Sequence, residues 1–540
     1  MAHGPQTLSQ FLSQPEAYDP RPAHVELHET HISWVFVTDR HAWKLKKPVR
    51  FEFLDFSTPP RRREACEAEV RLNRRLTDDL YLGVLPVFEV APGKFRIGNR
   101  EENEIAKTID AGQQAPVDWL VWMRRLPLDR TLDCLIQAQR VQPADISRLA
   151  ERLTHFYQAA VPIDIAADEY CHTIDRHVRA NLAELVRPAH GLAANTVRRS
   201  HGAQLRWLAT HGQVLGDRVR SGRIVEGHGD LRPEHICLAE PLQIFDCLEF
   251  NSEFRRLDVV DELAFLAMEC DALGADWIGQ QILDVYIAAT GDHAPVDLVA
   301  FYKSYRAAVR AKVAALRASQ LTAADAQAAR HTAERYLELA DRYADKLGPP
   351  PLVVVRGLMG TGKSTVARAL AERIGALQLS TDEVRLELLG ASDVPAAFGA
   401  GNYTAENRDR VYDELCSRAV ARIAAGLAVV LDGTFLSAAS QRRAVEVAVE
   451  RGLPVLVVNC HCPAEVAKVR IAQRLTAGGD ASEARPELFD QQLARDEPTP
   501  AEFPAIRVDT TQPLAMNLEQ IVAEFGNFAQ EREGSKDRVL

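Results

Sequence analysis

The sequence predicts two domains of different fold class. Residues 1–347 are expected to form an α+β domain with a small β-rich lobe and a larger helical lobe, and residues 348–540 an α/β domain with a parallel sheet. Three observations predict this: short strands crowd residues 24–47, long amphipathic helices run from Pro143 to Val219, and a strand, a glycine-rich turn and a helix follow one another from Leu352. At 540 residues the chain is also too long for one hydrophobic core.

Composition narrows the class of protein. Hydrophobic residues make up 46% of the chain and charged residues 26%, which is ordinary for a globular protein. The formal net charge of −11 disfavours nucleic acid and membrane surfaces as partners. No apolar run approaches the ~20 residues that span a bilayer, and the first residues lack the pattern of a signal peptide. Together with nine cysteines that show no paired spacing, these features predict a cytoplasmic protein without membrane contact.

The cysteines include one close pair, Cys460 and Cys462, which flank His461 at the end of an apolar run. The pair could suggest a metal site, but no second cluster of ligands follows it. We therefore expect buried strand cysteines here.

The β-rich lobe is predicted from alternating apolar residues. Strands are expected at residues 24–29, 32–38, 41–47, 84–90, 94–99 and 119–127, with a helix at 61–76. Lys44 and Lys46 alternate along the third strand and so share one face. Lys44 could alternatively be an exposed lysine of an edge strand.

The helical lobe follows the last of these strands. Helices are expected at residues 146–160, 174–186, 197–219 and 296–347. The Gly-Pro-Pro-Pro run at 348–351 ends the last helix and is too short for a flexible tether. The domain boundary is therefore placed there, and we expect the two domains to contact each other.

Asp258 and Asp261 are expected at the start of a further helix, in a structural role.

Three polar residues near the middle of the chain have the spacing that phosphoryl transfer needs. Asp230 lies in GHGDLRPEHICL, His235 follows five residues later, and Asp246 ends an apolar strand expected at 242–245. One carboxylate would orient or deprotonate an attacking hydroxyl, and two further ligands would hold Mg²⁺ against the phosphates. This spacing favours Asp230 as the base and His235 and Asp246 as metal ligands. Asp230 as a turn residue and Asp246 as a solvated strand end are the plainer alternatives.

On the segments HGDLRPEHI and IFDCLEF the N-terminal domain resembles the aminoglycoside phosphotransferase family, a branch of the protein-kinase-like fold. The whole chain resembles bacterial two-part proteins that join such a domain to a P-loop kinase. The resemblance implies a bilobal kinase-like fold in which Lys44 binds the α/β-phosphates of ATP and Glu69 holds Lys44. Lys46 and Glu67 are the rivals for those two roles. Two features depart from the pattern: no G-x-G-x-x-G precedes Lys44, and His235 is a borderline ligand for Mg²⁺.

The C-terminal domain begins with a phosphate-binding motif. Apolar residues from Leu352 to Val355 lead into GLMGTGKS, which matches G-x-x-x-x-G-K-[ST]. The glycines allow the backbone to aim N–H groups at a phosphate, and the next helix adds its dipole. Lys363 is expected to reach the β/γ-phosphates, and the Ser364 hydroxyl to ligate Mg²⁺. The nucleotide-binding set is Gly357, Gly360, Thr361, Gly362, Lys363, Ser364 and Thr365.

Further polar residues follow the strands of this domain. The D-x-x-R of Asp382 and Arg385 resembles the acceptor site of small-molecule and polynucleotide kinases of the P-loop class. That resemblance implies that Asp382 is a base and that Arg385 holds the acceptor. Asp432 ends a buried strand, where an acid that holds the Mg²⁺ shell is expected. The structural alternatives are that Asp382 caps a helix while Arg385 lies on the surface, and that Asp432 is an acid of a turn.

A helix bearing Arg470 and Arg474 resembles the arginine-bearing lid of gluconate-type and polynucleotide kinases. The two arginines are four residues apart and share one face, so both could reach the transferred phosphate. A solvated charged face is the alternative. Arg485 is a third candidate, and the segment 401–415 is expected to cover the acceptor.

These patterns predict a bifunctional, ATP- and Mg²⁺-dependent phosphotransferase that acts on hydroxyls of small molecules. One alternative is that the N-terminal domain is a nucleotide-binding pseudokinase that regulates the C-terminal enzyme. Another is that the C-terminal domain is a nucleic-acid end kinase or an ATPase switch, which the acidic net charge of −11 disfavours.

Overall fold

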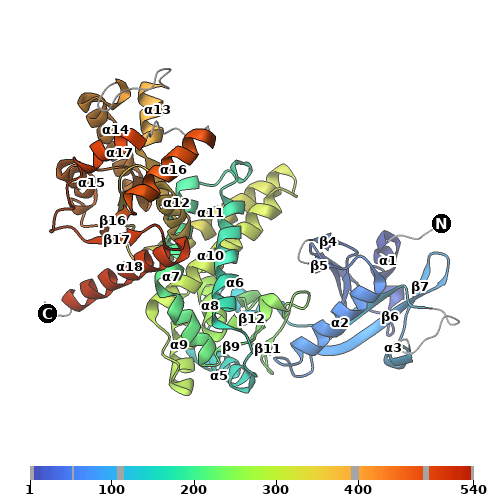
Figure 1. Cartoon of the computed structure of the whole chain (residues 1–540). Coiled ribbons are helices and arrows are strands. Elements are labelled where there is room, and N and C mark those ends of the chain that lie inside the picture. Colours follow the sequence, from blue (N-terminus) through green and yellow to red (C-terminus); the bar gives the residue numbers. More distant parts are fainter. Residues whose placement is uncertain (1–4, 52–53, 106–114, 391–400, 478–485, 537–540) are drawn as a thin grey trace. The chain divides into compact units, whose positions relative to one another are not determined.

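The structure is a computed structural model that describes residues 5–51, 54–105, 115–390, 401–477 and 486–536 (Figure 1). The chain forms two compact units, each built from two separate stretches of sequence. Unit 1 combines Met1–Ile165 with Arg218–Pro295, and unit 2 combines Ala166–Asp217 with Val296–Leu540. These limits do not follow the expected boundary between residues 347 and 348, which stays a prediction.

Unit 1 contains an antiparallel sheet, drawn in blue in Figure 1. Its described strands lie in the order β1-β2-β3-β8-β6-β7. They are β1 (Glu26–Glu29), β2 (Ser33–Val37), β3 (His41–Lys46), β6 (Tyr81–Ala91), β7 (Lys94–Ile97) and β8 (Asp118–Arg124), beside the small pair β4 (Arg50–Phe51) and β5 (Leu54–Asp55). Every strand expected in this region is confirmed, although β8 ends at Arg124 rather than at Pro127.

The remaining elements of unit 1 are mainly helical. They are α1 (Pro5–Leu12), α2 (Pro59–Asn73), α3 (Arg100–Ile105), α4 (Leu132–Gln137), α5 (Pro143–Ala159), α8 (Val259–Ala272), α9 (Asp276–Thr290), the antiparallel pairs β9 (Ile224–Glu226) with β12 (Arg256–Asp258) and β10 (Ile236–Cys237) with β11 (Gln243–Ile244), and the 3-10 turns η1 (Pro15–Ala17), η2 (Leu128–Arg130), η4 (Pro233–His235) and η5 (Glu253–Arg255). Unit 1 therefore combines antiparallel sheet with helices, whereas the kinase-like bilobal fold expected for residues 1–347 stays a prediction.

Helix α2 packs against β6 and β8 and fixes which way the lysines of β3 point. Ala42 packs into the apolar cluster between sheet and helix. Since side chains alternate along a strand, Lys44 and Lys46 face α2 as well, while Trp43 and Leu45 face the opposite side under α1. Strand β3 lies between β2 and β8, so Lys44 is not on an edge strand, and that alternative is wrong.

Helix α8 is buried on all sides and is the central helix of this part of unit 1. Every residue from Val259 to Cys270 is buried. An all-round apolar helix is typical of a core position. Asp258 caps it, because its carboxylate accepts a hydrogen bond of 3.0 Å from the Val260 N–H. The predicted structural role of Asp258 is thereby confirmed.

Asp258 also belongs to a buried ion cluster. Arg218, 7% exposed, donates hydrogen bonds of 2.7 Å to Asp258 and 2.9 Å to Asp292. The Tyr286 hydroxyl donates a further bond of 2.8 Å to Asp292. Burial acts to raise the pKa of Asp292, but the Arg218 guanidinium outweighs burial, so the net pKa is lowered. Arg218 is thus shared by two buried carboxylates, and Arg223, 3.5 Å from Asp292, adds a second positive charge.

The helices of unit 2 that precede the parallel sheet come from both of its sequence segments. They are α6 (Ala167–Leu185), α7 (Ala194–Arg220), which runs three residues into the second segment of unit 1, α10 (Val296–Ala318) and α11 (Ala323–Ala344), with the short turns η3 (Pro188–His190) and η6 (Asp345–Leu347). Leu185 of α6 and Val197 of α7 share one apolar cluster with alanines of α10 and α11. The helices predicted at 146–160, 174–186, 197–219 and within 296–347 are all confirmed.

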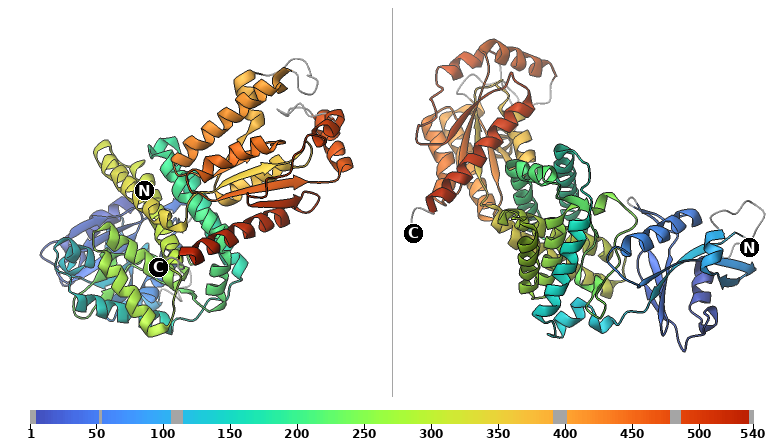
Figure 2. Two further views of the ribbon diagram at one scale, coloured as in Figure 1. Left: turned by 90° about the vertical axis from the view of Figure 1, so that its left-hand side faces the viewer. Right: turned by 90° about the horizontal axis from the view of Figure 1, so that it is seen from below.

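The described strands of unit 2 form a parallel sheet in the order β14-β15-β13-β16-β17. The strands and helices are β13 (Leu352–Arg356), α12 (Lys363–Ile374), β14 (Leu377–Ser380), α13 (Thr381–Leu389), η7 (Gly401–Tyr403), α14 (Ala405–Ala424), β15 (Val429–Asp432), α15 (Ala438–Val449), β16 (Val455–His461), α16 (Ala464–Ala477), α17 (Pro486–Leu493), β17 (Ala505–Asp509) and α18 (Leu514–Lys536). Helices α14 and α15 cover one face, and α12 and α18 cover the other (Figure 2). Both faces are covered, as the apolar strands require, and the predicted α/β fold is confirmed.

Within unit 2, helices α6 and α7 touch the far end of α12. Arg179 donates a hydrogen bond of 2.8 Å to the Glu372 carbonyl. Gly202 and Gly375 meet so closely that a Cβ on Gly202 would lie 2.7 Å from the Gly375 carbonyl oxygen. The end of the helix that follows the phosphate loop is thus fixed against α7.

Across the described residues, no helix is both long enough and apolar enough to cross a bilayer.

We expect Arg218→Leu to destabilise unit 1 by about 3–5 kcal/mol, because two buried carboxylates lose the guanidinium that they share, and Asp292 keeps only the more distant Arg223 as a cation. Urea denaturation of the full chain, followed by circular dichroism, measures this change. The control is Arg148→Leu, which removes solvent-accessible ion pairs with Asp145 and Glu240 and should cost less than about 1 kcal/mol. Equal midpoints for the two variants would show that the cluster is not stabilising.

Candidate functional site

The first candidate site lies at the carboxyl end of β13 in unit 2. Leu352 to Arg356 are fully or almost fully buried, and β13 pairs with β15 on one side and β16 on the other. Helix α12 begins directly after the glycine-rich turn, at Lys363. Ligands of open parallel sheets bind beyond the carboxyl ends of the strands, and this turn lies at that edge.

Two glycines of the turn are required by close backbone approach, and a third, Gly362, by its backbone conformation. A Cβ on Gly357 would lie 2.5 Å from the Cys460 carbonyl oxygen, and one on Gly360 would lie 2.5 Å from the Ala467 carbonyl oxygen. Gly360 and Gly362 also have positive φ angles of 75° and 82°. Thr361 is buried and donates a hydrogen bond of 2.8 Å to the Leu358 carbonyl, which closes the turn. The loop is therefore preformed with its backbone turned toward the start of α12, where a phosphate is stabilised by N–H groups and the helix dipole.

Asp432 ends β15 beside the loop, as predicted. It is 2% exposed; its Oδ2 accepts a hydrogen bond of 3.1 Å from Gln378, and its Oδ1 has no hydrogen-bond partner among the described residues. Burial raises the pKa of Asp432, although the Lys363 ammonium and a hydrogen bond from Ser364 act against this. An unsatisfied buried carboxylate oxygen beside a serine hydroxyl suits a hard divalent cation such as Mg²⁺.

Arg470 on α16 holds the turn after β17 against the phosphate loop. Its guanidinium donates hydrogen bonds of 3.0 and 2.8 Å to the hydroxyl and carbonyl oxygens of Thr510. The Thr510 hydroxyl in turn donates a bond of 2.7 Å to the Thr361 carbonyl. Arg470 is therefore part of the loop's surroundings rather than of a remote solvated face.

A cavity of about 400 Å³ opens next to this contact. Its lining combines the loop, the arginine helix and the start of α18, namely Gly362, Thr365, Val366, Arg470, Gln473, Arg474, Thr510, Gln512, Leu514 and Asn517. The structure thus brings Arg470 and Arg474 together at one cavity, as their spacing predicts. Arg485, the third candidate, lies outside the described residues.

Asp382 and Arg385 lie on α13, after strand β14. They form an ion pair, and the Arg385 guanidinium stacks 4.5 Å from the ring centre of Tyr403. The segment expected to cover the acceptor therefore does contact the D-x-x-R pair. The Asp382 carboxylate adds to the raised pKa of Asp432, so the two acids influence each other across the edge of the sheet. Ser380 caps α13 and accepts a hydrogen bond from the Asp382 N–H.

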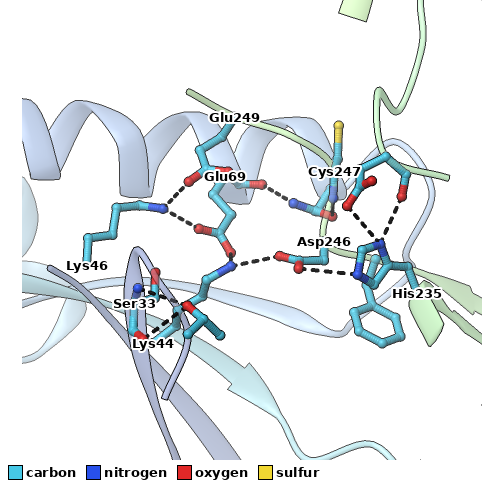
Figure 3. Close-up of polar contacts among 12 residues, drawn as sticks. Ser33, Lys44, Lys46, Glu69, His235, Asp246, Cys247 and Glu249 are labelled. Atoms are coloured by element: carbon cyan, nitrogen blue, oxygen red, sulfur yellow. Dashed lines mark hydrogen bonds and ion pairs between the residues drawn. The ribbon is translucent and has the colours of Figure 1, made fainter. Parts of the chain in front are cut away.

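The second candidate site lies in unit 1, around the lysines of β3 (Figure 3). Lys44 Nζ lies 2.9 Å from Glu69 Oε1 and 2.7 Å from Asp246 Oδ1. Lys46 Nζ lies 2.6 Å from the other oxygen of Glu69 and also pairs with Glu249. The predicted contact between Lys44 and Glu69 is present, and Glu67 instead pairs with Arg63 at 3.2 Å.

The charges of this cluster stabilise one another. Burial alone would lower the pKa of Lys44, but Asp246 and Glu69 outweigh burial and raise that pKa well above its ordinary value. Desolvation alone would raise the pKa of Asp246, but the Lys44 ammonium outweighs it, and the pKa lies well below its usual range. Asp246 has a left-handed backbone with φ of 62°, an uncommon conformation for a residue other than glycine.

Asp230 and His235 lie next to Asp246. The His235 Nδ1 lies 2.9 Å from the Asp230 carbonyl oxygen, which can only accept, so Nδ1 carries the proton. The His235 Nε2 lies 3.6 Å from Asp246 Oδ2 and accepts a hydrogen bond of 3.1 Å from Arg232. Asp246 therefore suits a divalent cation, whereas His235 could ligate one only if Arg232 moved away. Arg232 also lies 3.1 Å from the Asp230 carboxylate.

Sequence reasoning missed the residue that holds the Asp230 loop. Glu262 is buried on α8 and accepts hydrogen bonds from the backbone N–H groups of His228 and Gly229, and one of 2.8 Å from the Tyr157 hydroxyl. His228 bonds the Phe245 carbonyl through Nε2, which also holds this loop. No periodic signal marks Glu262, since it is one of several acids on α8, beside Asp261 and Glu269.

The remaining metal-like motif gives no site. Cys460 is buried on β16, and the described residues hold no group of three or more His, Cys, Asp or Glu side chains that could bind a metal. The interpretation as a buried strand cysteine is confirmed for Cys460 but is wrong for Cys462, which follows the end of β16 and is only partly buried.

Residues 352–499 match the AAA domain family. Similar solved structures cover about a third of the chain. A gluconokinase from Sinorhizobium meliloti 1021 is 23% identical, covering 35% of this chain and 97% of that chain with a TM-score of 0.27. A sugar kinase from Janibacter sp. HTCC2649 is 24% identical, covering 33% and 95% with a TM-score of 0.26. The APS kinase CysC of Mycobacterium tuberculosis, in complex with AMPPNP and APS, is 20% identical, covering 33% and 98% with a TM-score of 0.26.

Two mycobacterial proteins are similar in sequence to this chain over most of its length. The uncharacterized protein Rv2004c of Mycobacterium tuberculosis (strain ATCC 25618 / H37Rv) is 33% identical over 470 residues, which covers 85% of this chain and 88% of the relative. The uncharacterized protein Mb2027c of Mycobacterium bovis matches with the same identity and coverage. The chain therefore belongs to the family of these two mycobacterial proteins.

Proposed function

We propose that this chain is an ATP-dependent phosphotransferase whose unit 2 transfers the γ-phosphoryl group of ATP to a hydroxyl of a small molecule. The observation that carries the proposal is the preformed glycine loop before α12, with Lys363 and Ser364 at the helix start and the buried Asp432 beside them. Backbone N–H groups, an ammonium and a helix dipole together suit a polyphosphate. The cavity beside Arg470, about 400 Å³ in volume, leaves room for the rest of a nucleotide.

The acceptor is assigned to the side of Asp382 and Arg385. Asp382 would accept the proton of the attacking hydroxyl. A bond then forms between that oxygen and the γ-phosphorus, and the bond from the γ-phosphorus to the bridging oxygen breaks, leaving ADP. Lys363 would balance the negative charge of the phosphate groups, and Arg470 and Arg474 would do so from the cavity side.

Ser364 and Asp432 are the residues that would hold Mg²⁺, which when bound neutralises phosphate charge. A serine hydroxyl and a buried carboxylate oxygen without a partner are oxygen donors of the kind that this ion prefers.

Unit 1 is proposed as a second ATP-dependent site with a kinase-like arrangement. The contacts that support it are the Lys44–Glu69 pair and the placement of Asp246 and Asp230 next to each other. Lys44 would bind phosphate oxygens, Asp246 would hold a divalent cation, and Asp230 would orient the acceptor hydroxyl. His235 would then keep the Asp230 loop in place through its hydrogen bond of 2.9 Å.

A pseudokinase role for unit 1 is the second candidate, favoured by one observation. The turn between β1 and β2, residues 30–32, contains no glycine, so it cannot cover phosphates as a glycine-rich loop does. In that case unit 1 would bind a nucleotide without turnover.

An acceptor screen with γ-labelled ATP tests both sites. We expect Lys363→Ala to reduce phosphoryl transfer at the unit 2 site at least about a hundredfold, because a charged transition-state contact is lost. Asp230→Asn should abolish a separate set of transfers assigned to unit 1. The readout is labelled product for each acceptor, measured with wild type and both variants.

The two variants also separate the alternatives. If Asp230→Asn changes no transfer while nucleotide still binds unit 1, the pseudokinase role stands. If neither variant changes transfer to any acceptor found, both site assignments are wrong.

A second test concerns the cavity beside the phosphate loop. We expect Arg470→Ala to weaken ATP binding to unit 2 about tenfold to a hundredfold, because it removes a charged group and releases the Thr510 turn. Isothermal titration calorimetry of the full chain carrying Asp246→Asn measures this affinity with the unit 1 site weakened. Arg442→Ala, which removes an exposed ion pair with Glu502, is the control and should change the affinity less than twofold. If the affinity for ATP is unchanged in Arg470→Ala, Arg470 does not contribute to nucleotide binding.

A further inference from the structure

Two lysines of unit 1 share one glutamate, but their surroundings differ (Figure 3). The Lys44 side chain is 11% exposed and faces Asp246 as well as Glu69. The Lys46 side chain is fully buried and lies between Glu69 and Glu249. Lys46 therefore has no access to a ligand, and a role in direct phosphate binding is assigned to Lys44 alone.

Burying the Lys46 charge is costly unless it is fully compensated. Glu69 is fully buried and Glu249 is 4% exposed at the side chain, so both partners are desolvated with it. The two carboxylates keep Lys46 protonated, since they raise its pKa above the ordinary value against the effect of burial. Lys46 also contacts the ring of Phe56 at 5.0 Å. Such a compensated charge fixes the geometry of all its partners.

Glu249 is connected to the site through its place in the chain. It lies three residues after Asp246, in the same loop. This loop is held by the sheet side of unit 1 at two further points: the Tyr81 hydroxyl accepts a hydrogen bond of 3.2 Å from the Asp246 N–H, and Asn73 accepts one of 2.9 Å from the Cys247 N–H. The Lys46–Glu249 pair is a further anchor of this loop, and it is charged, as is the Lys44–Asp246 pair.

We propose that Lys46 and Glu249 are a positioning pair that fixes the loop of Asp246, so that the Asp246 carboxylate is presented to a divalent cation bound with a nucleotide. The inference rests on the function proposed for unit 1. Lys46 holds Glu69 from the side away from Lys44, so Glu69 remains paired when Lys44 turns to a phosphate. Glu249 prevents the left-handed backbone at Asp246 from relaxing to an ordinary conformation.

The test uses the full chain carrying Lys363→Ala, so that the unit 2 site does not contribute. The affinity for ATP is measured with Mn²⁺ and again in EDTA, and bound Mn²⁺ is followed by electron paramagnetic resonance. We expect Glu249→Gln, which keeps the size of the side chain, to weaken Mn²⁺-dependent ATP binding about tenfold. Binding in EDTA should change less than twofold, because Lys44 is untouched.

Two further variants control for a merely structural effect. Glu29→Gln removes the partner of the neighbouring Lys47 in an exposed pair, and it should change neither affinity. Lys46→Arg keeps the charge but not the shape, and it should weaken Mn²⁺-dependent binding several-fold even if Glu249→Gln does not fold.

The outcomes separate this inference from the function on which it rests. If Asp246→Asn abolishes the gain from Mn²⁺ while Glu249→Gln and Lys46→Arg behave like Glu29→Gln, the positioning role is wrong and the site stands. If Asp246→Asn retains the full gain, unit 1 does not use this carboxylate, and both proposals fail. Equal weakening in Mn²⁺ and in EDTA would indicate general damage to the fold and would also overturn the positioning role.

Discussion

A carboxylate without access to water stays ionised only when opposite charges lie beside it, and Glu69 is the clearest case of this constraint. Two ammonium groups from one strand meet its two oxygens, at 2.9 and 2.6 Å. These contacts of Glu69 constrain the rotation of α2 about its axis, the register of β3 and the position of the Asp246 loop. Removing the Glu69 carboxylate would leave Lys46 buried with Glu249 as its one remaining carboxylate partner among the described residues, so the network is far more constrained than an exposed salt bridge.

The parts of the fold that could be predicted are those set by local rules. Alternation along β3 was enough to place Lys44 and Lys46 on one face, and both reach Glu69. The spacing of glycines before Lys363 was enough to predict the phosphate loop, because only glycine tolerates the backbone contacts at Gly357 and Gly360. Asp432 was placed by the rule that polar groups gather at the carboxyl ends of parallel strands.

Other parts depend on packing that the sequence does not display. Which of Glu67 and Glu69 faces the lysines depends on how α2 is rotated about its own axis against the sheet. That rotation is set by the apolar contacts of the whole helix. Glu249 finds its partner 203 residues earlier in the chain, and Glu262 reaches backbone N–H groups 34 and 33 residues away. No rule of sequence spacing predicts the partner of a single acid when that partner lies far away in the chain. The exchange of segments between the two units is equally invisible, because α6 and α7 have the same amphipathic pattern whichever unit they join.

That exchange of segments has a consequence for synthesis on the ribosome. Unit 1 has all of its residues once Pro295 has been made, whereas α6 and α7 leave the ribosome long before α10, α11 and the β13 sheet exist. At about 5–20 residues per second, the apolar faces around Leu185 and Val197 wait several seconds for the alanine-rich helices that bury them. During that interval an unfinished stretch of unit 2 is joined at both ends to a unit that can already fold. The order of translation therefore leaves the apolar faces of these two helices open to chaperones and to aggregation until α10 and α11 are made.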